Sequence, residues 1–246
     1  MDRFYAPTGS DSETDSDTEV ITLPEGEARH FLRVLRGKVG DQILLFDGQG
    51  HEMTAEATSV SKKEVVVRVL ERRYEPPASP RIVLATAVPK GERLRWLVEK
   101  ATELGVDAIQ PLLTQRSVVD PRPTKMARLE NNVIAACKQC GRNHLMTLHE
   151  PQPLDAVLDA AAQSGEALIA AVPGGGTAVD VLSEAIASGG AGTIRMLVGP
   201  EGGWTEAELS RFEESGCLPI GLGRNILRIE TAALGLAAIA GAFRDQ

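Results

Sequence analysis

Residues 193–203 read TIRMLVGPEGG, a short apolar run followed directly by a glycine-rich loop. A run of this length and composition is typical of a strand buried in the centre of a parallel sheet. The same arrangement recurs at residues 167–176 (ALIAAVPGGG) and at residues 218–223 (LPIGLG). Ligands bind beyond the carboxyl ends of the strands in open α/β sheets, and glycine lets a backbone approach a ligand closely. The three loops together therefore predict one ligand site, although each loop taken alone is also consistent with a tight turn.

The segments around these loops alternate between strand and helix patterns. An apolar run at Arg81–Val88 precedes a helix pattern over Glu92–Leu104, in which we expect Trp96 to pack in the core. The further expected elements are a strand at Val106–Leu113, a helix from Thr124 to about Gln139, a helix opened by a capping box of Thr205 and Glu208, and a helix over Glu230–Phe243. This alternation predicts an α/β layer architecture.

Residues 20–70 have a different pattern, with short strands separated by tight turns. Gln42–Phe46 is a β-rich run closed by the turn dipeptide Asp47-Gly48, and Val65–Leu70 is a second dense strand. Such closely spaced short strands predict a small β-barrel. The stretch EPPASP at residues 75–80 disrupts regular structure. The sequence therefore predicts a β-barrel domain over residues 1–74 and an α/β domain over residues 80–246.

The net charge of −8 is distributed unevenly along the chain. Residues 1–19 carry six acidic residues and one basic residue, and residues 151–246 carry twelve acidic and five basic residues. Residues 80–150 carry eleven basic and seven acidic residues. The overall acidity is therefore compatible with an RNA-binding face. The acidic stretch at residues 8–19 is expected to be a solvated or disordered segment.

A basic cluster lies within the first expected domain. It places five candidate cations within ten residues without an acid, and they are Arg29, His30, Arg33, Arg36 and Lys38. Arg3 is a further candidate. Side chains of this kind contact RNA phosphates in a salt-dependent way. The alternative is a solvated surface of a helix or strand.

Other classes of site are disfavoured. The glycine-rich loops do not complete the dinucleotide-binding pattern, and no Walker A sequence occurs. Cys137 and Cys140 form a C-x-x-C pattern near His144 and His149, but both cysteines fall on an expected helix, so we expect free thiols and no metal. The odd number of cysteines indicates a reducing cytoplasm, and no apolar run is long enough for a membrane span.

Six segments carry a family resemblance that extends over nearly the whole chain. They read MDRF at residues 1–4, RHFLRVLR at 29–36 with GD and FDG downstream, VEKATELG at 98–105, QCGR at 139–142, LVGPEGGW at 197–204 and LGRNILRIETA at 222–232. Together they resemble the ribosomal RNA small subunit methyltransferase E family of the SPOUT superfamily. The resemblance implies an N-terminal PUA-like β-barrel and a C-terminal α/β methyltransferase domain tied in a trefoil knot. It also implies a homodimer that uses S-adenosylmethionine to methylate N3 of one uridine in the decoding region of 16S rRNA, in the small ribosomal subunit.

The resemblance also assigns residues to the cofactor site. Carried over position by position, these are Ala170, Ala171, Pro173, Leu197, Gly199, Pro200, Glu201, Gly202, Gly203, Leu222, Gly223, Ile226, Leu227 and Thr231. Arg142, in the QCGR segment, is a candidate on the RNA side. The family often has acidic residues in the helix before that segment, where this chain has Ala135 and Lys138. This departure concerns RNA contact rather than the cofactor site.

The reaction that the resemblance implies needs two further groups. Uracil N3 carries a weakly acidic proton, which must be removed or its anion stabilised. Glu201 is the candidate base, and Arg228 is the candidate cation near the uracil oxygens. The alternative for each is an ion pair or hydrogen bond that holds the loops.

Two rival functions remain at this point. One is a ribose 2′-O-methyltransferase of the same superfamily, which the PUA-like segment and the arginine cluster disfavour. The other is a non-catalytic RNA-binding or ribosome assembly factor, which has no need of three intact ligand-facing loops. Mapping the methylated position would distinguish the first rival from an N3 methyltransferase. A test of cofactor binding would distinguish the second rival from both enzymes.

Overall fold

The computed structural model describes residues 1–7, 19–117, 128–187 and 192–244. It contains two compact units, one formed by residues 1–77 with 137–145 and the other by residues 78–136 with 146–246. Most of the acidic stretch at residues 8–19, and the expected helix cap Thr124, lie outside the described residues. Among the described helices, none combines the length and the apolar composition that a bilayer span requires.

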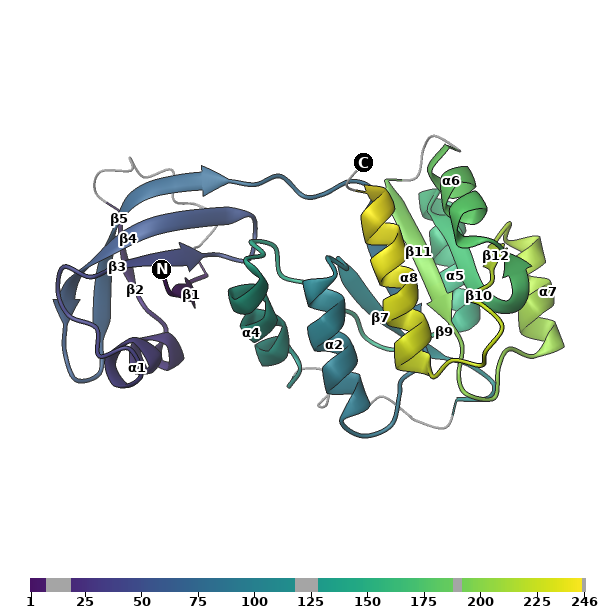
Figure 1. Ribbon diagram of the computed structural model, residues 1–246, viewed down its shortest axis with the longest axis horizontal. Helices are drawn as coiled ribbons and strands as arrows, with labels where there is room; N and C mark the ends of the chain where they lie inside the picture. The colour runs from purple at the N-terminus through teal and green to yellow at the C-terminus, as the bar shows by residue number, and fades with distance from the viewer. Residues whose placement is uncertain (8–18, 118–127, 188–191, 245–246) are drawn as a thin grey trace. The chain divides into compact units, whose positions relative to one another are not determined.

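The first unit is built on a curled five-stranded sheet (Figure 1). In spatial order its strands are β1 (Arg3–Tyr5), β3 (Gln42–Phe46), β4 (His51–Val60), β5 (Val65–Tyr74) and β2 (Val20–Thr22). The strands β3, β4 and β5 form an antiparallel meander, and the register between β4 and β5 shifts twice. Because such irregularities bend a strand pair and increase its twist, they account for the curl. The predicted β-barrel is thus a half-barrel with β1 and β2 at its edges.

A helix that the strand pattern did not predict covers this sheet. Helix α1 (Glu25–Arg33) begins after Pro24 and buries Ala28 and Phe31. Phe31 joins the core that the sheet contributes, including Phe4, Leu45 and Met53. The apolar side of α1 is therefore fixed in the core, and its charged side faces solvent.

The segment 137–145 belongs to the first unit by its contacts, although the sequence predicted it within the second domain. It contains the end of α4 (Glu130–Cys140). Arg3 donates hydrogen bonds to Asn143 Oδ1 at 2.7 Å and to the Arg142 carbonyl at 3.3 Å, and pairs with Glu52 at 3.2 Å. Lys138 also pairs with Glu27 at 2.6 Å. These polar contacts tie a distant part of the sequence to the N-terminal sheet.

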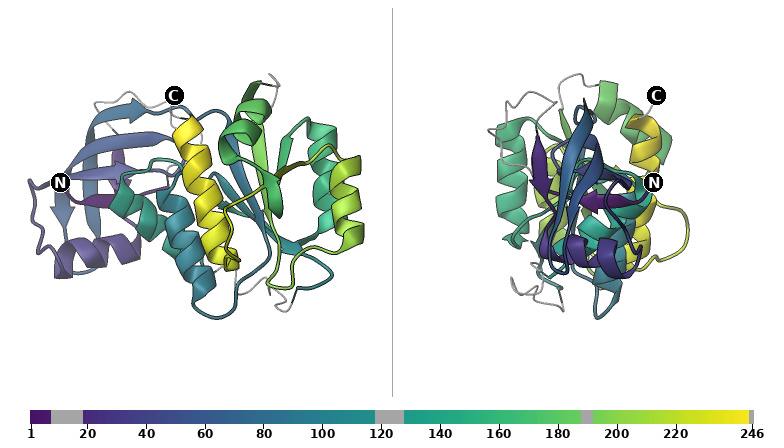
Figure 2. Two further views of the ribbon diagram at one scale, coloured as in Figure 1. Left: turned by 45° about the vertical axis from the view of Figure 1, so that its right-hand side comes forward. Right: turned by 90° about the vertical axis from the view of Figure 1, so that its left-hand side faces the viewer.

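The second unit confirms the α/β prediction, with a parallel sheet between helices (Figures 1 and 2). The strand order is β12 (Leu218–Ile220), β10 (Ala167–Gly176), β11 (Thr193–Val198), β6 (Arg81–Thr86), β7 (Ala108–Leu113) and β8 (Thr147–Leu148), with β9 (Gln152–Pro153) also paired to β7. The helices are α2 (Arg93–Glu103), α5 (Leu154–Ser164), α6 (Ala178–Ala187), α7 (Glu206–Glu214) and α8 (Ile229–Arg244). The expected capping box of Thr205 and Glu208 starts α7. Trp96, expected in the core, is 47% exposed on α2, so that expectation was wrong.

Strand β10 extends through the glycines that the sequence suggested would form a loop. Its register against β12 shifts between Ala171 and Gly176. At Gly175 an added Cβ would lie 2.7–2.8 Å from backbone atoms of Pro219 and Ile220, and at Gly221 it would lie 2.8 Å from the Gly175 carbonyl oxygen. Real Cβ atoms do not approach other atoms this closely. The two segments can therefore cross only because glycine occupies both positions.

One carboxylate joins three parts of the second unit. Asp107 Oδ2 accepts hydrogen bonds from the Ile82 backbone N–H at 2.7 Å and from Arg244 Nη1 at 2.8 Å. Arg244 Nη2 also donates to the Gly105 carbonyl at 2.9 Å. The start of β6, the turn before β7 and the end of α8 are thus held at one largely buried ion pair.

We expect Asp107→Asn to lower the free energy of unfolding by about 3 kcal/mol, because it leaves the charge of Arg244 largely buried and unpaired. Equilibrium denaturation measures this change. The control is Glu71→Gln, which removes one partner of an exposed pair with Arg73 and should cost less than about 1 kcal/mol. Equal costs for the two variants would contradict the structural role of Asp107.

Candidate functional site

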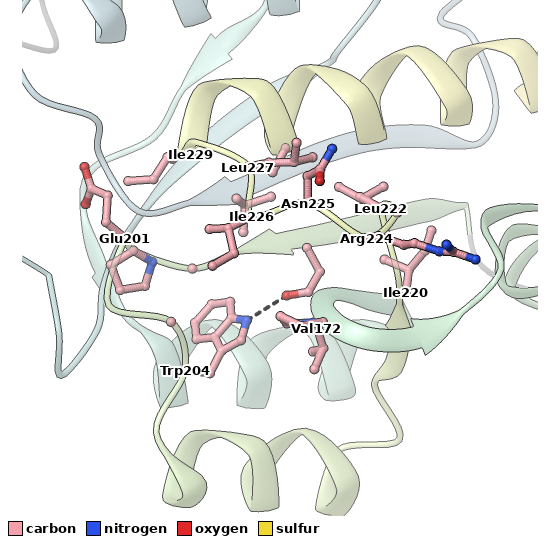
Figure 3. Close-up of a pocket in the computed structure, with 18 residues that line it drawn as sticks. Val172, Glu201, Trp204, Ile220, Leu222, Arg224, Asn225, Ile226, Leu227 and Ile229 are labelled. Carbon is pink, nitrogen blue, oxygen red and sulfur yellow. Dashed lines mark hydrogen bonds between the residues drawn. The ribbon is translucent and has the colours of Figure 1, made fainter.

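A cavity of about 200 Å³ lies at the carboxyl ends of β10, β11 and β12, where the sequence predicted a ligand site. Figure 3 shows its lining side chains, with Glu201 at one end and Arg224 at the other. The lining consists of Ala171, Val172, Pro173, Val198, Gly199, Pro200, Glu201, Gly203, Trp204, Ile220, Leu222, Gly223, Arg224, Asn225, Ile226, Leu227, Ile229 and Ala232. It is mostly apolar and includes one carboxylate, one guanidinium and one side-chain amide.

Trp204 forms one wall and links two of the glycine-rich segments. Its indole N–H donates to the Ala171 carbonyl at 2.9 Å, the bond drawn in Figure 3. Its ring packs on Gly199, where an added Cβ would lie 2.8 Å from Trp204 Cε2. Phe212 of α7 meets the ring edge-on at 4.9 Å between centroids. Because its polar atom is satisfied, Trp204 presents a fixed apolar surface to the cavity.

The opposite wall is the segment between β12 and α8. In Figure 3, Leu227, Asn225 and Leu222 lie across the cavity from Trp204 and Val172. This segment is exposed, and Ile226 is 98% exposed. At its end, Ile229 and Ala232 are buried as α8 begins. Ile226 is thus an exposed apolar side chain that also lines the cavity.

Most residues of the predicted cofactor set line the cavity. Those that do are Ala171, Pro173, Gly199, Pro200, Glu201, Gly203, Leu222, Gly223, Ile226 and Leu227. Ala170 and Leu197 instead belong to the hydrophobic core. Gly202 lies against Arg116, and Thr231 is exposed on α8. None of these four lines the cavity, and so the structure does not bring them into it.

Five lining residues were missed by the sequence reasoning, and they are Val198, Trp204, Ile220, Ile229 and Ala232. Val172, Arg224 and Asn225 fall within the segments 170–173 and 222–227, which the resemblance assigns to the pocket. Val198, Trp204 and Ile220 directly flank the glycine-rich segments, so the signal that located the site could have included them, whereas Ile229 and Ala232 belong to the start of α8. Trp204 is 9% exposed and forms one wall of the cavity.

The two candidate catalytic residues differ in position. Glu201 lines the cavity and has an exposed side chain. Arg228 is also exposed but is not part of the lining, and it directly follows Leu227, which is. The guanidinium that the cavity does contain is that of Arg224. In the described part of the chain, neither Glu201 nor Arg228 forms a side-chain ion pair.

The basic cluster forms part of a second cavity, in the first unit. This cavity has a volume of about 670 Å³ and is lined by Glu25, Arg29, Leu32, Arg33, Lys62 and Lys63. Arg29 pairs with Glu25 at 2.5 Å across one turn of α1. The sequence reasoning missed Lys62 and Lys63, because they occupy the β4–β5 turn, about thirty residues away in sequence. The structure thus joins two basic segments at one surface.

The remaining RNA candidates are placed differently. Arg36 and Lys38 are exposed after α1, whereas His30 is partly buried with its ring edge-on to Phe4. The Arg3 side chain is only 11% exposed, and it pairs with Glu52 and donates hydrogen bonds to the 137–145 segment. Its burial makes a phosphate contact by Arg3 unfavourable. Arg142 is partly buried, and its carbonyl accepts a hydrogen bond from Arg3.

The cysteines are free thiols in different environments. Cys137 is buried, and its Sγ lies 3.7 Å from the His144 carbonyl as a weak donor. Cys140 is exposed on the same helix. Burial raises the pKa of the Cys217 thiol to about 12, which keeps it protonated and unreactive at neutral pH. Among the described residues, no group of His, Cys, Asp and Glu side chains is arranged to hold a metal ion.

Comparison with known proteins relates both units to RNA methyltransferases. Residues 76–241 match a family described as an RNA methyltransferase domain, and residues 23–70 match one described as an RNA methyltransferase PUA domain. Ribosomal RNA small subunit methyltransferase E from Bacillus subtilis is 33% identical, over 97% of this chain and 96% of the relative. The protein of the same name from Mycobacterium tuberculosis is 32% identical, over 88% of this chain and 84% of the relative.

A solved structure is similar over the full length. The ribosomal RNA small subunit methyltransferase E from Neisseria gonorrhoeae, in a crystal structure bound to S-adenosyl methionine, is 34% identical with a TM-score of 0.84. The comparison covers 99% of this chain and 98% of that one.

Proposed function

This chain belongs to the ribosomal RNA small subunit methyltransferase E family, and we propose that it methylates N3 of one uridine in 16S rRNA. It is an S-adenosylmethionine-dependent RNA methyltransferase. The observation that carries the proposal is the apolar cavity at the carboxyl ends of β10, β11 and β12, formed mostly by residues 198–204 and 222–232, two of the segments that carry the family resemblance. Glu201, which lies at one end of this cavity with an exposed carboxylate, supplies the base that accepts the N3 proton.

The residues present fit the cofactor. S-adenosylmethionine supplies, when bound, an electrophilic methyl group on a sulfonium. The apolar faces of Val172, Trp204 and Leu222 suit its adenine ring and methylene groups. Backbone N–H and C=O groups of the glycine-rich segments can meet the polar edges of the cofactor, because no Cβ stands in front of them. These residues would hold the cofactor with few charged contacts.

The acid–base work falls to residues at the edge of the cavity. The thioether product is neutral, so the leaving side needs no acid, and the enzyme must mainly align the nucleophile. We assign Glu201 as the group that accepts the N3 proton, and Arg228 as the cation that stabilises the uracil oxygens. The lack of a described ion-pair partner for either side chain favours this assignment over a role in holding the loops.

RNA binding is assigned to the basic surface of the first unit. Arg29, Arg33, Lys62 and Lys63 around the second cavity, with Arg36 and Lys38 nearby, supply cations for phosphates. N3 lies on the Watson–Crick edge of uracil, so the target base must leave its pair or stack to be methylated. The phosphate contacts therefore hold the strand while the base is displaced.

The proposal extends to assembly and location. The final helix carries no charge from Thr231 to Phe243, and Thr231, Ala238 and Ala242 are exposed, which suits a symmetric contact with a second copy. We further propose the trefoil knot that the resemblance implies, which tracing the chain in an experimental structure would test. Three free cysteines support a cytoplasmic location, where the small ribosomal subunit or its rRNA is the substrate.

The two rival functions predict RNA products that differ from 3-methyluridine. A ribose 2′-O-methyltransferase leaves N3 unmodified, and an assembly factor without activity leaves the RNA unmodified. The cavity with its exposed carboxylate favours a catalytic role over an assembly factor. The PUA domain match and the basic surface favour uracil N3 over the ribose hydroxyl.

We expect Glu201→Gln and Arg228→Ala each to lower kcat by about 100-fold or more, since each removes a group that acts on the transition state. The measurement is formation of 3-methyluridine in small-subunit rRNA, quantified by nucleoside mass spectrometry, with S-adenosylmethionine affinity measured separately. The control is Glu206→Gln in the exposed first turn of α7. Near-normal turnover of both folded variants would refute the catalytic assignment.

Neutralising Arg33 and Lys63 together should reduce the slope of log affinity against log salt by about 1.5, since two phosphate contacts are lost. Binding of a small-subunit rRNA fragment is titrated at several salt concentrations. Arg73→Gln, which alters an exposed arginine outside this cavity, serves as the control. An unchanged slope would show that the basic surface is only solvated.

Ala238→Arg should convert the wild-type dimer into a monomer, because it places a charge on the uncharged face of α8. Light scattering after gel filtration gives the mass of each species. A monomeric wild-type protein, or a variant that remains dimeric, would rule out this interface.

A further inference from the structure

A short turn after β7 lies against the cofactor cavity from outside. The turn is closed on itself, since the Thr114 N–H donates to Ser117 Oγ at 3.2 Å and the Ser117 N–H donates to the Thr114 carbonyl at 3.1 Å. The two hydroxyls also share a hydrogen bond of 2.8 Å. This bonding gives Gln115 and Arg116 fixed positions at the tip of the turn.

Arg116 contacts the glycine-rich segment that forms one side of the cavity. Its Nη1 donates to the Gly202 carbonyl at 2.7 Å and to the Trp204 carbonyl at 3.2 Å. These carbonyls flank Gly203, which has a positive φ of 69° and lines the cavity. The aliphatic stem of Arg116 packs on Gly202, where an added Cβ would lie 3.2 Å from Cβ and Cδ of the arginine. One side chain thus holds both sides of a turn that glycine makes conformationally free.

A buried carboxylate provides a second contact between the same two segments. Glu208 Oε1 accepts the Gln115 N–H at 3.1 Å, and its Oε2 accepts the Thr205 N–H at 2.7 Å. Glu208 is only 5% exposed. It therefore caps α7 and joins the β7 turn to the end of the glycine-rich segment at the same time. We call these contacts of Arg116 and Glu208 the clasp.

We propose that Arg116 is a positioning residue for cofactor binding, acting through the clasp to hold residues 199–204 in the shape that receives S-adenosylmethionine. The inference rests on the proposed function and deepens it. Arg116 does not line the cavity, so its effect passes through Gly202 and Trp204. Lysine replaces it only in part, because its ammonium is strongly hydrated and sits on a flexible stem, whereas the planar guanidinium holds Nη1 within reach of both carbonyls. The clasp therefore acts on binding of the cofactor and not on the methyl-transfer step.

The test compares Arg116→Met, which keeps an apolar stem, with Arg116→Lys and the wild type. We expect Arg116→Met to weaken S-adenosylmethionine binding by about tenfold or more in calorimetry without RNA. Arg116→Lys should be intermediate, and kcat at saturating cofactor should stay within about threefold for both. The control is Arg211→Ala, which removes three ion pairs of α7 elsewhere and should lower stability without changing cofactor affinity.

A double-mutant cycle tests whether the effect passes through Gly202. Gly202→Ala should weaken binding in the wild type, because the new Cβ crowds the arginine stem. It should weaken binding less in an Arg116→Ala background, where the contacts with Cγ and Cδ are absent and only the contact with Cβ remains. Additive effects would overturn the proposed route.

A readout without cofactor separates failure of this inference from failure of the proposed function. In a Trp96→Phe background, Trp204 is the remaining tryptophan, and Arg116→Met should increase its quenching by acrylamide. Unchanged quenching together with unchanged cofactor affinity would overturn the role of Arg116. A loss of turnover with unchanged affinity would also overturn it, and would make Arg116 a contact to RNA. Absence of cofactor binding by the wild type would count against the proposed function, while the quenching result would still decide the clasp.

Discussion

Two backbone segments of the second unit cross so closely that neither has room for a side chain. Gly175 lies against the backbone of Pro219 and Ile220, and Gly221 lies against the Gly175 carbonyl. The crossing joins the end of β10 to the end of β12. This contact fixes the end of β10 beside the end of β12, and residues next to it on both segments line the cavity.

The rest of the site is fixed by contacts that reach the crossing from different directions. The Trp204 indole N–H bonds to Ala171 of β10, so the third glycine-rich segment is attached to the same strand. Arg116 and Glu208 hold that segment from outside. The segment before α8 is the exception, since Ile226 is almost fully exposed. The cavity thus has two rigid sides and one exposed side, where a large substrate can approach.

The features that could be predicted from sequence are those encoded locally. A strand pattern followed by glycines located the ligand site, because that order places the loops at one edge of a parallel sheet. Contacts across long sequence distances could not be predicted in this way. Arg3 was predicted to contact phosphate, but its side chain donates a hydrogen bond to Asn143. Lys62 and Lys63 lie beside Arg29 and Arg33 only in the folded chain. Helix α1 was missed because its apolar residues are few, with only Ala28 and Phe31 buried.

The most direct test of the account is the cofactor affinity of Gly175→Ala, measured by calorimetry with the full chain. The added Cβ must displace the backbone at Pro219 and Ile220, so we predict a loss of S-adenosylmethionine affinity of about tenfold or more. Gly192→Ala is the matched control, because a Cβ there meets open space. Wild-type affinity in Gly175→Ala would contradict the claim that this crossing builds the site.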